Sequence, residues 1–221
     1  ARRGEPHSPA RDATAGGVGV TPHPEFTGDI TNEVSNLADS WPVEHTEVGF
    51  ANDYLRVTVD TIADPGGEQH SRVVVRPRGA VGVAALDSDN RILLVQQFRH
   101  AVQKQTIEIP AGILDIPGEA KEVAAARELA EEADVRARTW KHLFQLNPTP
   151  GFCSEEIDIY LATDLESVAL ADRIEREAEE AHMKHWWVPL DRAVTAVLEG
   201  KITDGKTMAT ILAVGHISLG A

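Results

Sequence analysis

The stretch from Gly112 to Val135 constrains the fold more than any other part of the chain. A loop that contains Pro117 and Gly118 comes first, and from Glu119 onward the chain is rich in Ala, Glu and Leu, which predicts a helix. Apolar residues fall on one face of this helix, at a spacing that suits packing on a core. The opposite face carries three glutamates at positions i, i+3 and i+4, namely Glu128, Glu131 and Glu132.

Glutamates at this spacing repel one another by roughly a few tenths of a kcal/mol per pair. A divalent cation would remove the repulsion, and oxygen ligands without Cys or His suit a hard cation such as Mg²⁺ or Mn²⁺. The alternative is a solvated helix face on which Arg127 and Glu131 form an ordinary i,i+4 pair. The three glutamates alone favour this alternative, so the surrounding residues decide between the two interpretations.

The surrounding residues resemble the signature of the Nudix hydrolases. That signature is Gly, five residues, Glu, seven residues, then Arg-Glu-apolar-x-Glu-Glu-x-Gly-apolar. Here Gly112, Glu119 and the run from Arg127 to Glu132 match it, and seven residues separate Glu119 from Arg127. So many fixed positions make the match far more specific than a short glycine motif.

The chain departs from the signature at two points. Six residues, not five, lie between Gly112 and Glu119, and a loop tolerates such an insertion better than a helix would. Asp134 stands where the family has Gly, at a position expected to end the helix in a left-handed conformation. Asp accepts that conformation at a cost on the order of 1 kcal/mol. Neither change removes a carboxylate, so we expect the site to be intact.

Composition limits the classes of partner. The chain has 221 residues, of which 42% are hydrophobic and 25% charged, as in a soluble globular protein. The net charge of −14 argues against nucleic acids and anionic membranes as partners, and means that local arginines and a metal must offset repulsion of an anionic substrate. Cys153 is the single cysteine, which excludes an intrachain disulfide and favours a cytoplasmic location.

Three regions follow from the pattern along the chain. Residues 1–40 are rich in Gly, Pro, Ser, Thr and Arg, a composition that predicts a flexible tail. The pattern of this segment does not match a secretion signal. Residues 41–77 predict a strand region, built on the runs Val43–Phe50 and Tyr54–Ile62. Residues 78–221 predict the hydrolase domain, and no stretch reaches the roughly 18 apolar residues of a membrane span.

Within the predicted hydrolase domain, β-branched runs alternate with turns and only a few helices follow. The turn from Asp87 to Arg91 predicts a hairpin, Leu190–Leu198 and 203–218 predict helices, and the acidic stretch 164–180 is helix-prone or mobile. This order predicts an α+β fold with a mixed sheet between helices, an α/β/α sandwich. The Nudix resemblance implies the same fold.

Further segments resemble the ADP-ribose pyrophosphatase branch of the family. They are Val95–His100, Glu108–Gly112 and Pro150–Phe152, and Pro150 lies sixteen residues beyond Asp134, at the spacing that marks the branch. The resemblance implies a Mg²⁺-dependent enzyme that splits ADP-ribose, or a similar nucleoside diphosphate sugar, into AMP and a sugar phosphate. The alternatives are another sugar nucleotide such as GDP-mannose, or a non-catalytic Nudix-fold binding module.

The resemblance also implies roles for the residues of the signature. Glu128 and Glu132 would ligate metal directly, with the carbonyl of Ala111 completing the site. Glu131 would ligate a second ion or hold a metal-bound water. Arg127 would orient the glutamates rather than contact substrate.

The general base of this branch is a glutamate on a late loop. Glu180 aligns best with it, Glu179 second and Glu177 third, and the alternative is a solvated acidic helix. Arg99 would contact the substrate phosphate, unless it is a surface charge at a strand end. Arg72 would reach the nucleotide from a partner subunit.

A homodimer is the last implication of the resemblance. The segment from Val43 to Val75 has the pattern of strands but no helix to cover it, so its apolar face needs another surface, which a second subunit would provide. The alternative is that these strands pack on their own domain.

Overall fold

A computed structural model describes residues 20–22, 24–176 and 180–219 of the chain. The chain divides into two units, Ala1–Trp41 and Pro42–Ala221. The described residues of the first unit form two short antiparallel strands, β1 (Thr21–Pro22) and β2 (Asp29–Ile30), which the sequence pattern did not predict.

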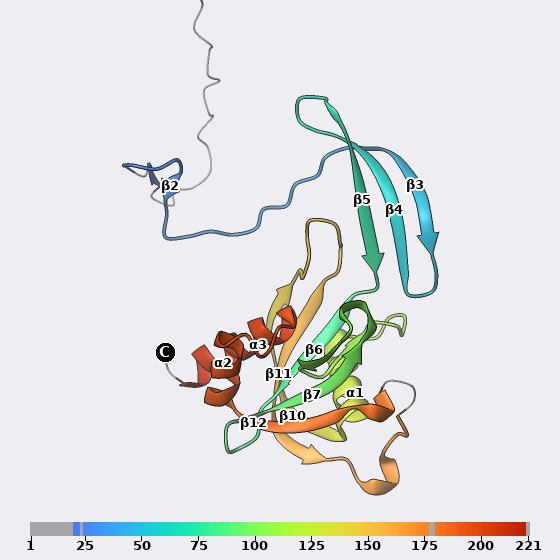
Figure 1. Cartoon of the computed structure of the whole chain (residues 1–221), viewed down its shortest axis with the longest axis vertical. Coiled ribbons are helices and arrows are strands. Elements are labelled where there is room, and N and C mark those ends of the chain that lie inside the picture. Colours follow the sequence, from blue (N-terminus) through green and yellow to red (C-terminus); the bar gives the residue numbers. More distant parts are fainter. Residues whose placement is uncertain (1–19, 23, 177–179, 220–221) are drawn as a thin grey trace, which may run out of the picture. The chain divides into compact units, whose positions relative to one another are not determined.

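The second unit contains the remaining strands and all the described helices (Figure 1). They are, in chain order, β3 (Val43–Ala51), β4 (Leu55–Ala63), β5 (Gln69–Pro77), β6 (Ala80–Ala85), β7 (Arg91–Arg99), the 3₁₀ helix η1 (His100–Val102), β8 (Lys104–Glu108), β9 (Ala111–Ile113), α1 (Lys121–Ala133), β10 (Val135–Leu146), β11 (Ile157–Ser167), the 3₁₀ helices η2 (Leu170–Asp172) and η3 (Glu180–His182), β12 (Lys184–Pro189), α2 (Leu190–Leu198) and α3 (Gly205–Leu219).

The strands of this unit form three sheets, in the orders β10-β11-β6-β9, β12-β7-β8 and β3-β4-β5. The pair β11–β6 is parallel and the other pairs are antiparallel, so the first sheet is mixed. This is the α+β arrangement that the sequence predicted, with a mixed sheet between helices.

Two hydrophobic cores lie on opposite faces of β6 and β7, because successive side chains of a strand point to opposite sides. Leu93 faces the core formed with Leu129 of α1, whereas Ile92 and Leu94 face the core formed with α2 and α3. The strands therefore lie between α1 on one side and α2 and α3 on the other (Figure 1). This packing buries the face of α1 that carries Leu129. The face that carries the glutamates lies beside β9.

Helix α1 begins at Lys121, slightly later than predicted, because Ala120 is still extended (φ −68°, ψ 140°). At the other end, Asp134 takes the left-handed conformation (φ 53°, ψ 34°), as the sequence predicted, and its N–H donates to the carbonyl oxygen of Ala130 at 3.1 Å. The Asp134 carboxylate pairs with the guanidinium of Arg176 at 2.8 Å. The residue that replaces the family's glycine thus acquires an ion pair that glycine cannot make.

The acidic stretch after residue 164 differs from the helix-prone prediction over its first part. β11 continues to Ser167, with Leu165 paired to Ala137 of β10, and Val168 is only 3% exposed. Acidic side chains point outward from this strand while apolar ones point inward, and the acidic composition obscured that alternation. A short helix, η2, follows.

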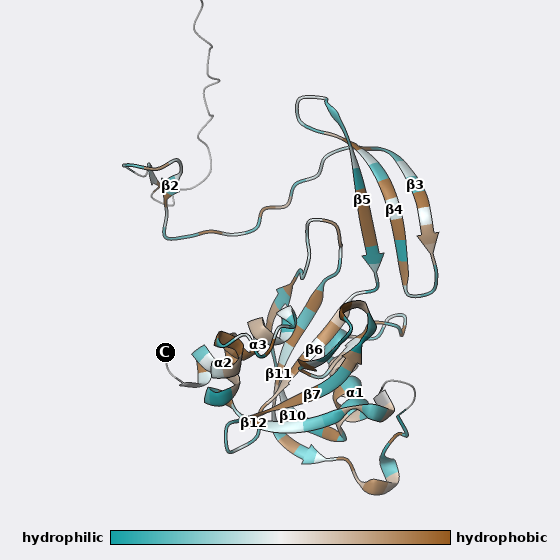
Figure 2. Ribbon diagram, viewed as in Figure 1, coloured by the Kyte–Doolittle hydropathy of each residue, from teal (hydrophilic) through white to brown (hydrophobic). Residues whose placement is uncertain are grey.

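The sheet β3-β4-β5 presents an apolar strip on one face. The register places Val59 opposite Val73 and Val57 opposite Val75, so these four share a face with Phe50. Figure 2 shows the apolar runs along β4 and β5. Phe50 is 53% exposed and Val73 54% exposed, so much of the strip faces solvent within this chain.

One end of β5 is joined to the loop between β10 and β11. The N–H of Val75 donates to the carbonyl oxygen of Phe152 at 2.8 Å, and the N–H of Ser154 donates to the carbonyl oxygen of Val75 at 3.0 Å. Among the described residues, no helix is both long and apolar enough to cross a membrane.

Candidate active site

The glutamate face of α1 lies against β9. Glu128 is 9% exposed and Glu132 is 4% exposed, while the side chain of Glu131 is 32% exposed. Burial raises the pKa of Glu128, because it penalises the charged carboxylate. The backbone N–H of Ala111 donates to Oε2 of Glu132 at 2.9 Å. Two carboxylates are therefore held in a largely dry position beside the backbone of β9.

The close approach of the Glu128 side chain requires a glycine at position 112. A Cβ at position 112 would lie 1.9 Å from Cδ of Glu128, so any side chain there would displace the carboxylate. The glycine that opens the signature therefore allows the glutamate of α1 to reach the backbone of β9.

Arg127 is the cation within this acidic group. Its guanidinium donates to Glu119 at 3.1 and 3.2 Å, to Glu128 at 2.7 Å and to Glu131 at 3.1 Å, and it pairs with Asp115 at 3.3 Å. The hydrogen bond to Glu119 is the largest cause of the raised pKa of Arg127. Arg127 therefore stays charged and fixes the rotamers of the signature glutamates.

The potential ligand atoms are of the kind that a hard divalent cation prefers. Glu128, Glu131, Glu132 and the carbonyl of Ala111 offer only oxygen ligands, and two of the carboxylates are buried. Within the described residues the three carboxylates do not yet converge within 4.8 Å of one another, since Arg127 holds two of them and Ala111 the third. Ion binding would require rotation of these side chains.

Among the described residues, a group of potential metal ligands that does lie within 4.8 Å of one another is in the turn between β4 and β5. It consists of Asp64, Glu68 and His70. The Asp64 carboxylate already accepts the N–H groups of Gly66 and Glu68 and contacts His70 at 3.2 Å. These contacts build the turn.

A hollow of about 610 Å³ opens beside Ala111 and Gly112. Arg99, at the end of β7, lies in its wall and makes two hydrogen bonds of 2.8 Å to the carboxylate of Glu108. Lys206 also donates to Glu108, at 2.5 Å. Burial opposes the charge on Glu108, but the hydrogen bonds from Arg99 and Lys206 outweigh it and lower the pKa to about 2. Cationic groups thus line the pocket next to the glutamates.

Sequence reasoning missed two lysines of this pocket, Lys104 and Lys206. Lys206 lies 98 residues after Glu108 in the chain, and only the tertiary packing of α3 against β8 joins them. No local pattern in the sequence signals such a pair.

The remaining predicted residues are placed as follows. Arg72 does not line the pocket; it is exposed on β5 and donates to the carbonyl oxygen of Ser71 at 2.9 Å. Glu180 begins the short helix η3, and Glu177 and Glu179 lie outside the described residues. Arg72 therefore lies away from the pocket of its own chain, and the choice of general base among the glutamates stays a prediction.

The residues that flank this late segment are bound to the end of α1. Nε of Arg176 donates to the carbonyl oxygen of Glu131 at 2.8 Å, and Nε2 of His185 lies 2.6 Å from the carbonyl oxygen of Glu132. Cations and hydrogen-bond donors at a helix C-terminus satisfy its free carbonyls and suit its dipole. Arg176 and His185, on either side of this segment, are therefore both bonded to the backbone at the C-terminal end of α1.

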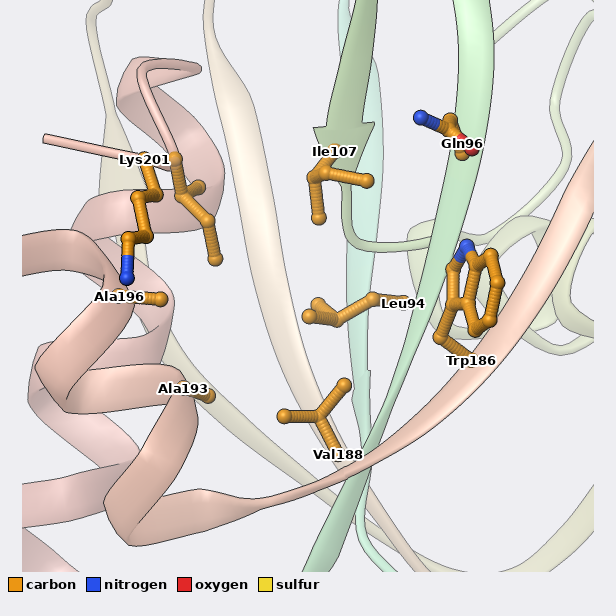
Figure 3. A pocket seen from close by; sticks show the side chains of 9 residues that line it. Leu94, Gln96, Ile107, Trp186, Val188, Ala193, Ala196 and Lys201 are labelled. Atoms are coloured by element: carbon orange, nitrogen blue, oxygen red, sulfur yellow. The ribbon is translucent and has the colours of Figure 1, made fainter.

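A second hollow, of about 260 Å³, lies between α2 and the strands β7 and β12 (Figure 3). Figure 3 shows Leu94 and Val188 directed toward Ala193 and Ala196 of α2, with the ring of Trp186 on the side of Gln96. No carboxylate lines it, so it lacks the ligands of the first pocket.

The carboxylate face of α1, the close approach of Gly112 and the mixed sheet between helices together define a Nudix site. The NUDIX domain model matches residues 76–211. The chain belongs to the Nudix hydrolase family.

Two relatives are similar to this chain over most of its length. It is 40% identical over 161 residues to the ADP-ribose pyrophosphatase of Mycobacterium tuberculosis, covering 73% of this chain and 76% of the relative. It is 33% identical over 174 residues to the methanol dehydrogenase activator of Bacillus methanolicus, covering 79% and 90%. A crystal structure of an ADP compounds hydrolase shares the fold, with a TM-score of 0.70 and 21% identity over 84% of this chain and 98% of that one.

Proposed function

We propose that the protein is a Mg²⁺-dependent pyrophosphohydrolase that cleaves the diphosphate of ADP-ribose, or of a similar nucleoside diphosphate sugar, into AMP and a sugar phosphate. The observation that carries the proposal is the pair of buried carboxylates, Glu128 and Glu132, beside the backbone of Ala111 at the edge of a pocket containing Arg99. The similarity to an ADP-ribose pyrophosphatase supports this choice of substrate.

Metal ions belong at the carboxylates. Glu128, Glu132 and the carbonyl of Ala111 would hold Mg²⁺, or Mn²⁺ in its place, and Glu131 would serve a second ion or its water. When bound, such ions neutralise the diphosphate and make a water molecule more acidic. Arg127, by its contacts with Glu119, Glu128 and Glu131, keeps the ligands in place.

Arg99 provides a phosphate contact in the same pocket. Its side chain is 44% exposed although it pairs with Glu108, so part of the guanidinium faces the hollow. A fixed cation there offsets the repulsion that a chain of net charge −14 exerts on an anionic substrate.

The general base in this proposal is Glu180, with Glu179 as the second candidate. Support comes from the resemblance and from Arg176 and His185, which bind the backbone of Glu131 and Glu132 on either side of this segment. Proton abstraction by one carboxylate contributes about 10²–10⁴-fold to rate.

A cytoplasmic homodimer completes the proposal. The strand region 41–77 exposes the apolar strip around Phe50 and Val73, and it carries Arg72 outside the pocket of its own chain. A second subunit would cover the strip and receive Arg72 in its own site.

The test is incubation of the protein with Mg²⁺ and ADP-ribose, with AMP measured by chromatography. Parallel reactions contain GDP-mannose and other nucleoside diphosphate sugars, and matched reactions contain EDTA. We expect AMP to form only with the metal, and ADP-ribose to have the highest kcat/KM. Absence of turnover across the whole panel would contradict the enzymatic proposal and favour a binding module.

A further inference from the structure

The carboxylate of Glu108 is shared by two cations of the pocket. Glu108 is 2% exposed, and Nε and Nη2 of Arg99 donate to its two oxygens at 2.8 Å each. Thr106 donates its hydroxyl to Oε1 at 2.6 Å, and Nζ of Lys206 donates to Oε2 at 2.5 Å. A buried carboxylate with this many donors is held in one position.

Lys206, like Glu108, is fixed by several hydrogen bonds around it. Asp204 caps α3, because its Oδ2 accepts the N–H of Thr207 at 3.0 Å, and the same oxygen lies 3.0 Å from Nζ of Lys206. The Thr207 hydroxyl in turn accepts the buried N–H of Ile109, the residue after Glu108, at 2.9 Å. The first turn of α3 is therefore bonded to the end of β8, and Lys206 has little freedom to move.

The charges of this group balance only when Lys206 is present. Arg99 and Lys206 contribute +2, and Glu108 and Asp204 contribute −2, so removal of Lys206 leaves a net charge of −1 in the pocket wall. Glu108 binds Arg99 through Nε and Nη2, and Nη1 makes no hydrogen bond within the described residues. That nitrogen is the part of the guanidinium left for an anionic ligand.

We infer that Lys206 is a substrate-positioning residue: by holding Glu108 it fixes Arg99, so that Nη1 of Arg99 is presented to a substrate phosphate. The inference rests on the proposed function and deepens it by adding a residue of α3 to the diphosphate-binding wall. Lys206 itself is 12% exposed at its side chain, so it acts through Glu108 and Arg99 rather than by contact with substrate.

The first test separates binding from chemistry. Lys206→Met is expected to raise the KM for ADP-ribose by about tenfold, the effect of losing one charged hydrogen bond, and to change kcat by less than about threefold. Lys206→Arg keeps the charge, so its KM is expected to lie close to that of wild type. Lys201→Met is the matched control, because Lys201 pairs with Glu199 beside the apolar hollow, and it should leave KM unchanged.

A double-mutant cycle tests the route through Arg99. In an Arg99→Ala background, Lys206→Met should change KM by less than about twofold, because the group on which it acts is gone. An additive effect, or an unchanged KM in the single variant, would overturn the inference.

Direct affinity distinguishes this inference from the proposed function. Calorimetric titration of ADP-ribose into wild type and Lys206→Met in EDTA should show weaker binding by the variant without any turnover. If wild type hydrolyses ADP-ribose but Lys206→Met binds it equally well, the inference fails and the function stands. If wild type neither binds nor hydrolyses ADP-ribose, the function fails and the inference with it. Should Lys206→Met not fold, as measured by thermal melting, Lys206→Gln and Lys206→Arg replace it in the same comparison.

Discussion

At the scale of single residues, the metal proposal depends most on Glu132, which is 4% exposed and bonded to the N–H of Ala111. Glu132→Gln keeps the shape of the side chain but removes a charged oxygen ligand. We expect Mn²⁺ affinity, measured by spin-resonance titration, to fall at least about tenfold and most turnover to be lost. Glu122→Gln, an exposed change on the same helix, should alter neither. Near-normal turnover of Glu132→Gln at limiting Mg²⁺ would contradict the assignment.

The ion pairs of Glu108 make the stability of the fold depend on pH. Its pKa falls from 4.5 to about 2 on folding, so its contribution to stability is complete above pH 4.5 and is lost as the pH falls toward 2. The whole effect is about 3 kcal/mol. Urea unfolding at several pH values should therefore show a shallower loss of stability over this window in Glu108→Gln than in wild type. If the free energy of unfolding fell equally steeply with pH in Glu108→Gln and in wild type, Glu108 would not be paired as described.

At the scale of elements, the end of α1 depends on Asp134. Asp134→Ala keeps a side chain in the left-handed conformation but loses the ion pair to Arg176, so we expect the free energy of unfolding to fall by about 2 kcal/mol. Asp134→Gly loses the same ion pair but relieves the backbone strain, so the loss should stay below about 1 kcal/mol. Urea denaturation measures both variants. Equal losses would mean that the backbone conformation carries no cost here.

Elements were predictable from the sequence where the signal is local. The turn at Asp87–Arg91, the helix after Glu119 and the left-handed Asp134 follow from turn chemistry, periodicity and capping. The prediction that this turn closes a hairpin was wrong, because β6 and β7 belong to different sheets and are joined by the isolated bridge between Leu86 and Ile92. The extension of β11 to Ser167 was missed because its outward acidic residues conceal a strand. The i,i+4 contact of Arg127 with Glu131 was predictable from their spacing, whereas the hydrogen bond from Ala111 to Glu132 was not, because it depends on tertiary packing.

The same limit applies to the candidate site. The residue types and spacing identified Glu128, Glu131 and Glu132, but not the contact between Gly112 and Glu128 or the pairing of Glu108 with Lys206. These contacts join residues far apart in the chain, and a single sequence carries no local trace of them. The positions of Glu177 and Glu179 lie outside the described residues, so the register of the base stays a prediction.

At the scale of the whole molecule, the exposed strip of the N-terminal sheet predicts how the protein associates. We expect light scattering to give twice the chain mass of 24.0 kDa for wild type. Val73→Asp places a charge in the strip and should shift the mass toward that of one chain and reduce activity. Val48→Asp is the matched control, since Val48 is similarly exposed but lies on the opposite face.

The contrary result would be an active, monomeric Val73→Asp protein, or a monomeric wild type. Removal of residues 1–40 should leave both the dimeric state and the activity unchanged, because that segment is poor in apolar residues that could pack.

The two hydrogen bonds of Val75 have a thermodynamic consequence. They join the sheet β3-β4-β5 to the loop that carries Phe152 and Ser154, and Pro148 and Glu155 near that loop line the pocket beside Ala111. Displacement of the strand therefore displaces the rim of the pocket. Linkage is reciprocal, so if a second subunit bound to the proposed dimer surface stabilised this rim for substrate binding, a bound substrate would stabilise the dimer by the same free energy.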